Sequence, residues 1–300
     1  MKVLKSLRRL PVAAVAAGFA VESRIAPASA AKQAAKLWCR LPGNAGRRMD
    51  NRPRPGRRLQ VEAAIGLRDT TTRTRLNTEL WGDEAAPIVY LVHGWGGWHG
   101  QLGAFVEPLL ARGFQVIGFD AASHGYSAPG EYGANLSSSP EIRRSFQAVV
   151  REFGQPHGII AHSLGCAVVA AALLEDVTTT NLALVAPSPD MVQYLTAFGR
   201  KLRLSAKAME QLRPQAEAWS GESLERSDPA VLARLGHDRL PPALIVHDRL
   251  DKEVRFKTAQ TLADAWPGAE LFTTEGLGHH RILKDPQVVA RVAAEMGENL

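Results

Sequence analysis

The chain has 300 residues, of which 45% are hydrophobic and 22% are charged, a balance that is typical of a globular protein and excludes a disordered, collagen-like or membrane-embedded chain. Its two cysteines, Cys39 and Cys166, are too few for a disulfide framework and lie in no metal-ligand spacing. The net charge of +6 is unevenly divided, because residues 1–60 carry 14 Lys and Arg against 2 acids and residues 61–300 carry 22 against 28. This division argues against a nucleic-acid-binding fold, in which positive charge would cover one face of the body.

Residues 1–58 are predicted to form a basic N-terminal arm and linker, ahead of a folded domain over residues 59–300. The apolar run Pro11–Val21 is shorter than the ~20 residues that span a bilayer. Instead, the segment from about Lys5 to Trp38 is predicted to form an amphipathic, Ala-rich helix that packs on the body or contacts anionic lipid. The Pro-, Gly- and Arg-rich stretch Leu41–Arg58 predicts an exposed linker.

The start of the chain also resembles a secretory signal. A basic segment precedes the apolar run, and Ala28-Ser29-Ala30 has the small residues of a cleavage site. Glu22 and Arg24 interrupt the approach to that site, however. We therefore expect a cytoplasmic protein rather than an exported one, with peripheral membrane contact through the arm as an open alternative.

Beyond the arm, short apolar runs rich in β-branched residues alternate with stretches of helical periodicity. Strands are predicted at 73–80, 88–92, 114–119, 158–161, 182–185, 243–246 and 270–273, and helices at 101–111, 140–153, 164–174, 256–266 and 286–296. Strands that are apolar throughout and alternate with helices indicate a parallel sheet covered on both faces. The predicted fold class is α/β, with a mostly parallel, doubly wound sheet and helices on both faces.

Residues 188–240 break this alternation, because they contain no strand pattern. We expect them to form a helical cap, or lid, inserted into the α/β domain. Their large apolar residues Tyr194, Phe198, Met209 and Trp219 either line an apolar pocket or form the core of the cap itself.

A candidate nucleophile lies in the segment Gly158–Cys166, which has the sequence GIIAHSLGC. Here a predicted strand ends in Ser163 and continues as a helix. A serine at such a strained strand-to-helix turn is exposed at the carboxyl edge of the sheet and can act as a nucleophile. The small residues Ala161 and Gly165 on either side of it allow the tight turn. The alternative is a serine that only caps the helix.

A glycine-rich loop, with the sequence HGWGG, follows the predicted strand 88–92. Glycines let the main chain approach a substrate closely, and acyl transfer needs two backbone N–H donors for the developing oxyanion. The backbone N–H groups of Trp95 and Leu164 are the candidates. A phosphate-binding loop is excluded, because neither GxxxxGK[ST] nor GxGxxG occurs in this stretch.

With these motifs the chain resembles the α/β-hydrolase fold superfamily, in particular its lid-bearing, bacterial esterase-like members, over about Ile88–Met296. The resemblance implies a triad in the chain order nucleophile, acid, histidine, with the acid after a late strand and the histidine after the last strand. The segments HDRLDKEV (residues 247–254) and EGLGHHR (residues 275–281) occupy those two places.

Each of the two segments offers a choice of residue. The usual spacing of the superfamily implies Asp251 as the acid, with Asp248 as the alternative. It likewise implies His279 as the base, with His280 as the alternative. The other histidines, acids and thiols near the motifs are expected to be structural: His93 and His247, Asp120 and His124 in the turn after the strand 114–119, His162 as a hydrogen-bonding strand end that lines the pocket, and Cys166 in the core.

These assignments predict a serine hydrolase that cleaves a carboxylic ester or thioester through Ser163, His279 and Asp251 and an acyl-enzyme intermediate, with no cofactor and no metal ion. The expected partner is a small-molecule ester or thioester, and no nucleic acid is expected. The alternatives are a C–C bond hydrolase or an acyltransferase on the same fold, and a non-catalytic binding or adaptor protein that works through the basic arm.

Overall fold

An eight-stranded sheet forms the centre of the protein in the computed structural model, which describes residues 12–43, 49–67 and 71–297. The strand order is β1-β2-β4-β3-β5-β6-β7-β8. The strands are β1 (Arg57–Ala64), β2 (Arg73–Trp81), β3 (Ile88–Val92), β4 (Gln115–Phe119), β5 (Gly158–His162), β6 (Asn181–Val185), β7 (Leu244–Asp248) and β8 (Glu270–Thr274). Strands β3 to β8 are parallel to one another, whereas β2 pairs antiparallel with both β1 and β4.

The strands that sequence patterning predicted are all present, with ends that differ by at most two residues. Every residue of β4, β5, β6 and β7 is buried, which explains why these strands are continuous apolar runs. The sequence analysis missed β1, an edge strand in which exposed residues alternate with partly or fully buried ones such as Val61 and Ala63. Because such a strand has no continuous apolar run, its pattern is weak.

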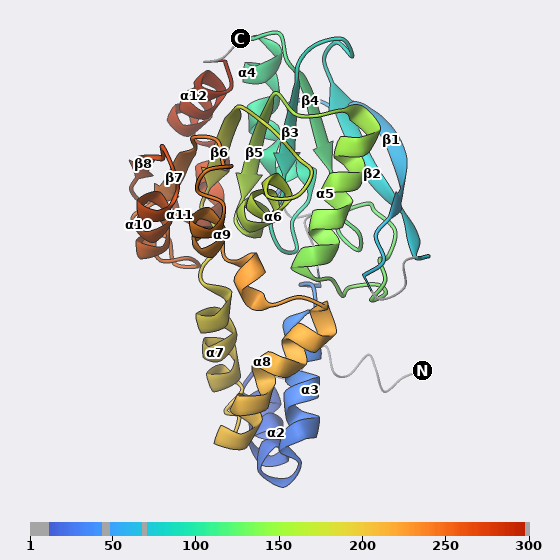
Figure 1. Cartoon of the computed structure of the whole chain (residues 1–300), viewed down its shortest axis with the longest axis vertical. Helices are drawn as coiled ribbons and strands as arrows, with labels where there is room; N and C mark the ends of the chain where they lie inside the picture. The colour runs from blue at the N-terminus through green and yellow to red at the C-terminus, as the bar shows by residue number, and fades with distance from the viewer. Residues whose placement is uncertain (1–11, 44–48, 68–70, 298–300) are drawn as a thin grey trace. The chain divides into compact units, whose positions relative to one another are not determined.

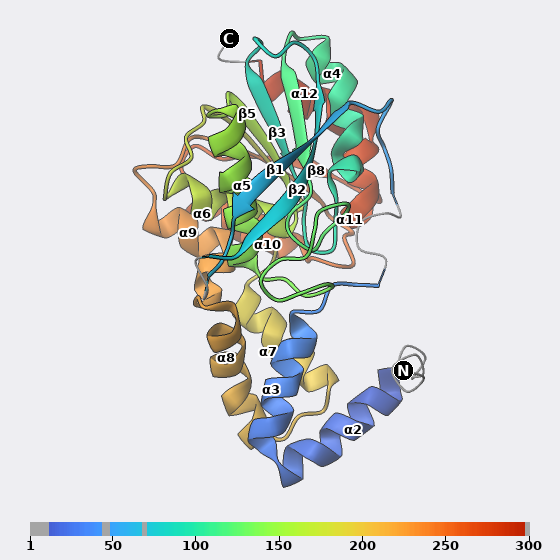
Figure 2. The same ribbon diagram turned by 90° about the vertical axis from the view of Figure 1, so that its right-hand side faces the viewer.

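Helices cover both faces of the sheet, as the predicted doubly wound architecture requires (Figures 1 and 2). Figure 2 shows α5 (Ser139–Phe153) and α6 (Leu164–Leu173) on one side of the strands, and α4 (Val106–Leu110) and α12 (Pro286–Glu295) on the other. The predicted α/β fold class is therefore confirmed.

Shorter helices complete both layers. On the side of α6, α9 (Pro229–Leu235) packs against α6 and against α10 (Phe256–Ala265). On the side of α12, the 3₁₀ helices η2 (His99–Phe105) and η4 (Ile282–Lys284) both contact α12, and the one-turn helix α11 (Gly278–Arg281) leads directly into η4. The predicted helix over residues 101–111 is thus divided into η2 and α4.

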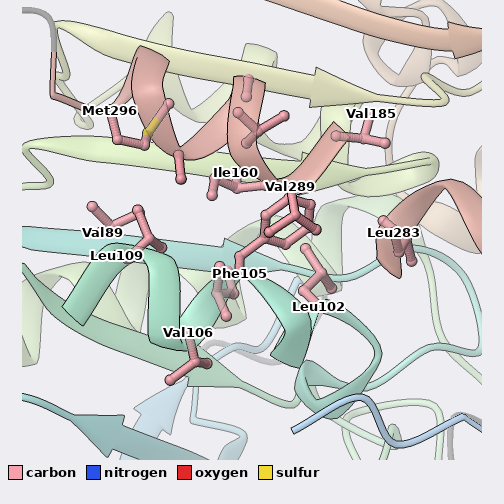
Figure 3. Packing of buried hydrophobic residues seen from close by; sticks show 14 of the residues in the cluster. Val89, Leu102, Phe105, Val106, Leu109, Ile160, Val185, Leu283, Val289 and Met296 are labelled. Carbon is pink, nitrogen blue, oxygen red and sulfur yellow. The ribbon is translucent and has the colours of Figure 1, made fainter. Parts of the chain in front are cut away.

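The main hydrophobic core lies between the sheet and the layer of η2, α4, η4 and α12 (Figure 3). Val89 and Ile160 contribute from the strands, Phe105 from η2 and Met296 from the end of α12, and all four are fully buried. Burying side chains of this size contributes about 1.5–3 kcal/mol each. This packing fixes the sheet, and with it the loops at the carboxyl ends of the strands.

The chain folds into two compact units. Unit 2 consists of residues 41–190 and 225–300 and contains the sheet, while unit 1 consists of residues 1–40 and 191–224. The described helices of unit 1 are α2 (Val12–Ile25), α3 (Pro27–Trp38), α7 (Met191–Lys201) and α8 (Ala206–Ser220). The remaining helix, η3 (Leu224–Ser227), starts at the last residue of unit 1.

Unit 1 has a small core of its own. Helix α3 packs against α8 and α7, and α2 packs against α3 and α8, as Figure 1 shows. Phe198 and Met209, which the sequence analysis placed either in a pocket or in the cap's own core, pack against buried Leu195 and Leu212 in this core. The N-terminal helices and the segment 191–224 therefore stabilise each other. A lid function for residues 188–240 stays a prediction.

One expectation about the N-terminal arm is wrong. The long helix over Lys5–Trp38 is broken, because Ala26 between α2 and α3 has a non-helical backbone (φ −135°, ψ 71°) ahead of Pro27, and proline disfavours a helical residue before it. The part of that helix before residue 12 lies outside the described residues. In the linker, most of the described residues between 41 and 58 are exposed, as expected, but the Arg52 side chain is only 10% exposed and pairs with buried Glu79 of β2.

Within the described residues, no helix combines the length and the apolar character that crossing a membrane requires.

Candidate active site

Ser163 is held at a sharp turn between β5 and α6. Its backbone has φ 54° and ψ −123°, a conformation that is strained for a residue with a side chain and that fits the turn expected of a nucleophile elbow. A Cβ on Gly165 would lie 2.7 Å from the backbone oxygens of Val92 and His93, so only glycine fits at that position. Ala161 takes the other small-residue position and is fully buried at the end of β5. The turn seen here is the one that the sequence motif predicted.

In the triad that the sequence analysis assigned, His279 lies within hydrogen-bonding distance of both Ser163 and Asp251. His279 Nε2, in α11 after β8, lies 3.0 Å from Ser163 Oγ. His279 Nδ1 lies 2.8 Å from Asp251 Oδ2, in the loop after β7. A carboxylate accepts only, so Nδ1 carries the proton and Nε2 is free to accept the Ser163 hydroxyl proton. Asp251 and His279 are both buried.

Asp251 is held as a carboxylate. Its Oδ1 accepts hydrogen bonds from the backbone N–H groups of Glu253 (2.7 Å) and Val254 (3.0 Å). Burial alone favours the neutral acid, but the hydrogen bond from His279 and these two N–H groups outweigh it, so that the pKa of Asp251 is lowered. A charged Asp251 can thus fix the orientation of the His279 ring and stabilise its protonated form.

The alternative acid, Asp248, has a different set of partners. Its two oxygens accept hydrogen bonds from Thr274 Oγ1 (2.8 Å) and from the backbone N–H groups of Leu277 (2.8 Å), Gly276 (3.2 Å) and Leu250 (3.0 Å). Asp248 therefore ties the loop after β7 to the loop after β8. This contact supports the segment that carries His279.

The alternative base, His280, has a different partner. Its Nε2 lies 3.1 Å from Glu253 Oε1, and its side chain is 43% exposed. His162, directly before Ser163, is buried, and its Nε2–H donates to the backbone oxygen of His279 at 3.0 Å. The rings of His162 and His279 are 4.8 Å apart. Burial first, and the neighbouring histidines second, hold the pKa of His162 well below its ordinary value, so this ring is neutral.

The glycine-rich loop after β3 packs directly against the elbow. A Cβ on Gly94 would lie 2.8 Å from Ser163 Cβ and 3.0 Å from the backbone oxygen of His162. His93 braces this loop, because its Nδ1 lies 2.8 Å from its neighbour's oxygen, Gly94 O, and its Nε2 accepts from Ala121 N–H at 3.1 Å. Trp95 therefore follows a loop segment that is fixed beside the serine.

Leu164 has the backbone position that an oxyanion donor needs. It is the first residue of α6, and the first N–H groups of a helix have no acceptor within the helix. They also lie at the positive end of the helix dipole, which favours negative charge. The N–H of Leu164 is thus available next to Ser163.

A buried ionic cluster supports the far end of the glycine-rich loop, and the sequence analysis missed it. His99 follows that loop and lies between two carboxylates, with Nε2 2.7 Å from Glu79 Oε2 and Nδ1 2.8 Å from Asp120 Oδ1. All three side chains are fully buried. Arg52 adds a further cation, 2.6 Å from Glu79. Asp120, predicted to shape its turn, does so by accepting from Tyr126 N–H at 2.9 Å.

These charges determine the protonation of the cluster. Burial disfavours the charged form of His99, but the nearby Asp120 and Glu79 outweigh it and raise the pKa of His99 to about 9. Burial also opposes ionisation of Glu79, yet its hydrogen bonds from His99, Gly56 N–H and Arg52 lower its pKa to about 2. The cluster is therefore an imidazolium between two carboxylates at neutral pH.

Two other side chains have the structural roles that the sequence predicted. The Cys166 thiol is fully buried in α6, 3.4 Å from Ala161 O, and burial raises its pKa, which leaves it an unreactive thiol. His247 is buried and its Nε2 lies 3.1 Å from Val254 O, in the loop that carries Asp251. Across the described ranges, no group of three or more His, Cys, Asp or Glu side chains is arranged to hold a metal ion.

A family model described as the alpha/beta hydrolase family matches residues 89–292, a range that includes the elbow, the loop after β7 and α11. The chain belongs to the alpha/beta hydrolase family. Membership in this family supports the assignment of the chain as a hydrolase.

Solved structures show the same fold. An esterase from Exiguobacterium antarcticum is 17% identical, with a TM-score of 0.57 over 80% of this chain and 99% of that one. A thermophilic esterase from Thermogutta terrifontis is 16% identical, with a TM-score of 0.57 over 79% and 97%. A bromoperoxidase from Bacillus anthracis is 14% identical, with a TM-score of 0.54 over 79% and 99%. Because these proteins carry different descriptions, the shared fold does not select one reaction.

Proposed function

We propose that this alpha/beta hydrolase is a serine hydrolase that cleaves a carboxylic ester or thioester through an acyl-enzyme. The observation that carries the proposal is the chain of short contacts from Ser163 Oγ through His279 to Asp251, with distances of 3.0 and 2.8 Å. A hydroxyl beside a neutral imidazole nitrogen, whose other nitrogen donates to a carboxylate, is the arrangement that activates serine for attack on a carbonyl.

In the proposed first step, Ser163 Oγ attacks the acyl carbonyl carbon and His279 Nε2 takes the hydroxyl proton. The negative charge on the carbonyl oxygen is stabilised by the N–H groups of Leu164 and Trp95, each worth about 3 kcal/mol in comparable sites. His279 then gives its proton to the leaving alcohol or thiol as the tetrahedral intermediate collapses. Asp251 stabilises the imidazolium that exists between these two transfers.

In the second step, water attacks the acyl-enzyme. His279 takes a proton from the water and returns it to Ser163 Oγ, which releases the carboxylic acid and restores the serine. A serine nucleophile with a base and two backbone donors needs no further group for this sequence of steps. Which acyl and leaving groups the site accepts depends on residues other than Ser163, His279 and Asp251.

A fluorophosphonate probe tests the proposal, because it phosphonylates only an activated serine. We expect the wild-type chain to be labelled, and Ser163→Ala and His279→Asn to remain unlabelled. His280→Asn is the matched control, since it changes the neighbouring histidine, whose partner is Glu253, and it should keep full labelling. Wild-type protein that is folded, as judged by circular dichroism, and yet unlabelled would refute the proposal.

Turnover of p-nitrophenyl esters and acyl thioesters of increasing chain length then defines the substrate class. For Asp251→Asn we expect kcat to fall about 10³- to 10⁴-fold, because the amide favours the wrong tautomer of His279. Labelling without turnover of any ester or thioester would instead favour a C–C bond hydrolase or an acyltransferase.

A further inference from the structure

Unit 1 is far more basic than the rest of the protein. Its residues 1–40 and 191–224 contain 13 Lys and Arg against 4 acids, whereas unit 2 contains 23 against 26. The sequence shows a basic arm, but only the fold joins that arm to a second basic segment, Arg200–Lys207, in one compact unit. The hydrolase machinery described above, all of it in unit 2, does not use this charge.

Unit 1 also exposes large apolar side chains on α2. Val21 is 61% exposed and Ile25 is 80% exposed, and their spacing of four residues puts them on the same side of the helix. Ala14, Ala17 and Gly18 are exposed as well, and the described part of α2 has only Glu22 and Arg24 as charged residues. A solvent-facing helix surface normally carries polar residues instead.

Exposed cations lie on the turn that packs against the end of α2. Ser205, between α7 and α8, donates to α2 through its backbone N–H, 3.0 Å from Ser23 Oγ, and through its hydroxyl, 2.5 Å from Ser23 O. These bonds hold the turn with Arg203 and Lys207 against the end of α2 that carries Arg24 and Ile25. Arg24, Arg203 and Lys207 are all exposed, and among the described residues none of them pairs with a carboxylate.

We propose that this surface, the basic-apolar patch of Val21, Arg24, Ile25, Arg203 and Lys207, binds an anionic lipid bilayer. Aliphatic side chains can enter the boundary between headgroups and acyl chains, while the flanking cations contact lipid phosphates. Helix α2 has 14 residues and a length of about 21 Å, so it would lie in the interface. The patch thus places unit 1 on the membrane surface, independently of the reaction in unit 2.

Other occupants fit the patch less well. A second copy of the chain would bring two strongly positive units together, which opposes association. Single-stranded nucleic acid would require aromatic side chains on which bases stack, and the exposed apolar residues of α2 are aliphatic. An anionic bilayer satisfies both the charge and the aliphatic surface.

Co-sedimentation of the full chain with vesicles tests the proposal. We expect binding to phosphatidylcholine vesicles that contain about one third phosphatidylglycerol, no binding to phosphatidylcholine alone, and loss of binding in about 0.5 M NaCl. The double variant Arg203→Glu with Lys207→Glu should lower the partition coefficient onto these vesicles at least about tenfold. The double variant Val21→Ser with Ile25→Ser should lower it by a similar factor. The matched controls in unit 2, Arg112→Glu with Lys257→Glu and the exposed Leu235→Ser, should bind as the wild type does.

Hydrolysis of a soluble ester is expected to be unchanged in all of these variants, which verifies folding and separates this test from that of the proposed function. Absence of binding to anionic vesicles would overturn the proposal. So would equal binding by the patch variants and the wild type. Light scattering that shows a dimer dissociated by Val21→Ser with Ile25→Ser would assign the patch to a second copy, and binding to an oligonucleotide but not to vesicles would assign it to nucleic acid.

Discussion

His99 provides a sharp test of the electrostatics beside the active-site loop. Its ring lies between Glu79 and Asp120 at 2.7 and 2.8 Å, and these contacts raise its pKa from 6.5 to about 9. Below pH 6.5, His99 is protonated in the folded and the unfolded chain, and the cluster contributes its full stability. Between pH 6.5 and 9 only the folded chain keeps the proton, so the free energy of unfolding falls by up to about 1.4 kcal/mol per pH unit.

Over that range the contribution of His99 that is lost amounts to about 3 kcal/mol. The substitution that tests this contribution is His99→Gln, because the glutamine side chain does not titrate in this pH range. We expect this variant to be less stable than the wild type by about 3–5 kcal/mol near pH 6.5, because it leaves Glu79 and Asp120 without the cation between them. The difference should shrink by about 3 kcal/mol as the pH rises above 9.

Urea unfolding at a series of pH values measures both quantities. Trp98 and Trp81 report on the cluster by fluorescence, since their rings lie 5.0 and 6.2 Å from the ring of His99. Groups that titrate elsewhere affect both proteins equally and cancel in the difference. His237→Gln, at an exposed histidine, is the control and should reproduce the wild-type pH dependence. A stability difference between the wild type and His99→Gln that stays constant from pH 6.5 to above 9 would refute the reasoning.

Two further predictions concern the elbow. In Gly94→Ala, the new Cβ would lie 2.8 Å from Ser163 Cβ and 3.0 Å from His162 O, so the serine must move. We therefore expect kcat for a soluble ester to fall at least about 100-fold. An unchanged kcat would contradict this packing. In His162→Phe, a somewhat larger aromatic ring without a donor replaces the imidazole and the hydrogen bond to His279 O is lost. We expect kcat to fall about tenfold at unchanged KM. His162→Gln, which retains an N–H donor, should recover part of that loss, and equal kcat values for the two variants would argue against a positioning role.

The sequence was most informative where the structure depends on neighbours along the chain. Continuous apolar runs located the buried parallel strands, since a strand covered on both faces has no polar side to interrupt the run. The elbow was visible for the same reason, because its turn needs small residues two positions before and after Ser163. The edge strand β1 was missed, since alternating exposure leaves no continuous run.

Residues that meet through the fold could not be found in this way. The choice between Asp248 and Asp251 came from the family resemblance, and in the structure it reflects which carboxylate is occupied by N–H groups of the loop after β8. The Glu79–His99–Asp120 cluster joins residues about twenty positions apart, and the sequence analysis named only Asp120 of the three, as a turn residue. Its charges are compatible with burial only because the fold brings them together.

The sequence by itself therefore determined the α/β class, the positions of strands β2 to β8 along the chain and the position of the serine turn, because periodicity and turn chemistry act over a few residues. Only the tertiary structure decided that His279 lies 3.0 Å from Ser163 and 2.8 Å from Asp251, and that the N-terminal helices share a unit with residues 191–224. Contacts of this kind depend on how the elements pack, and packing arises from side chains that are distant in the chain and become neighbours only on folding.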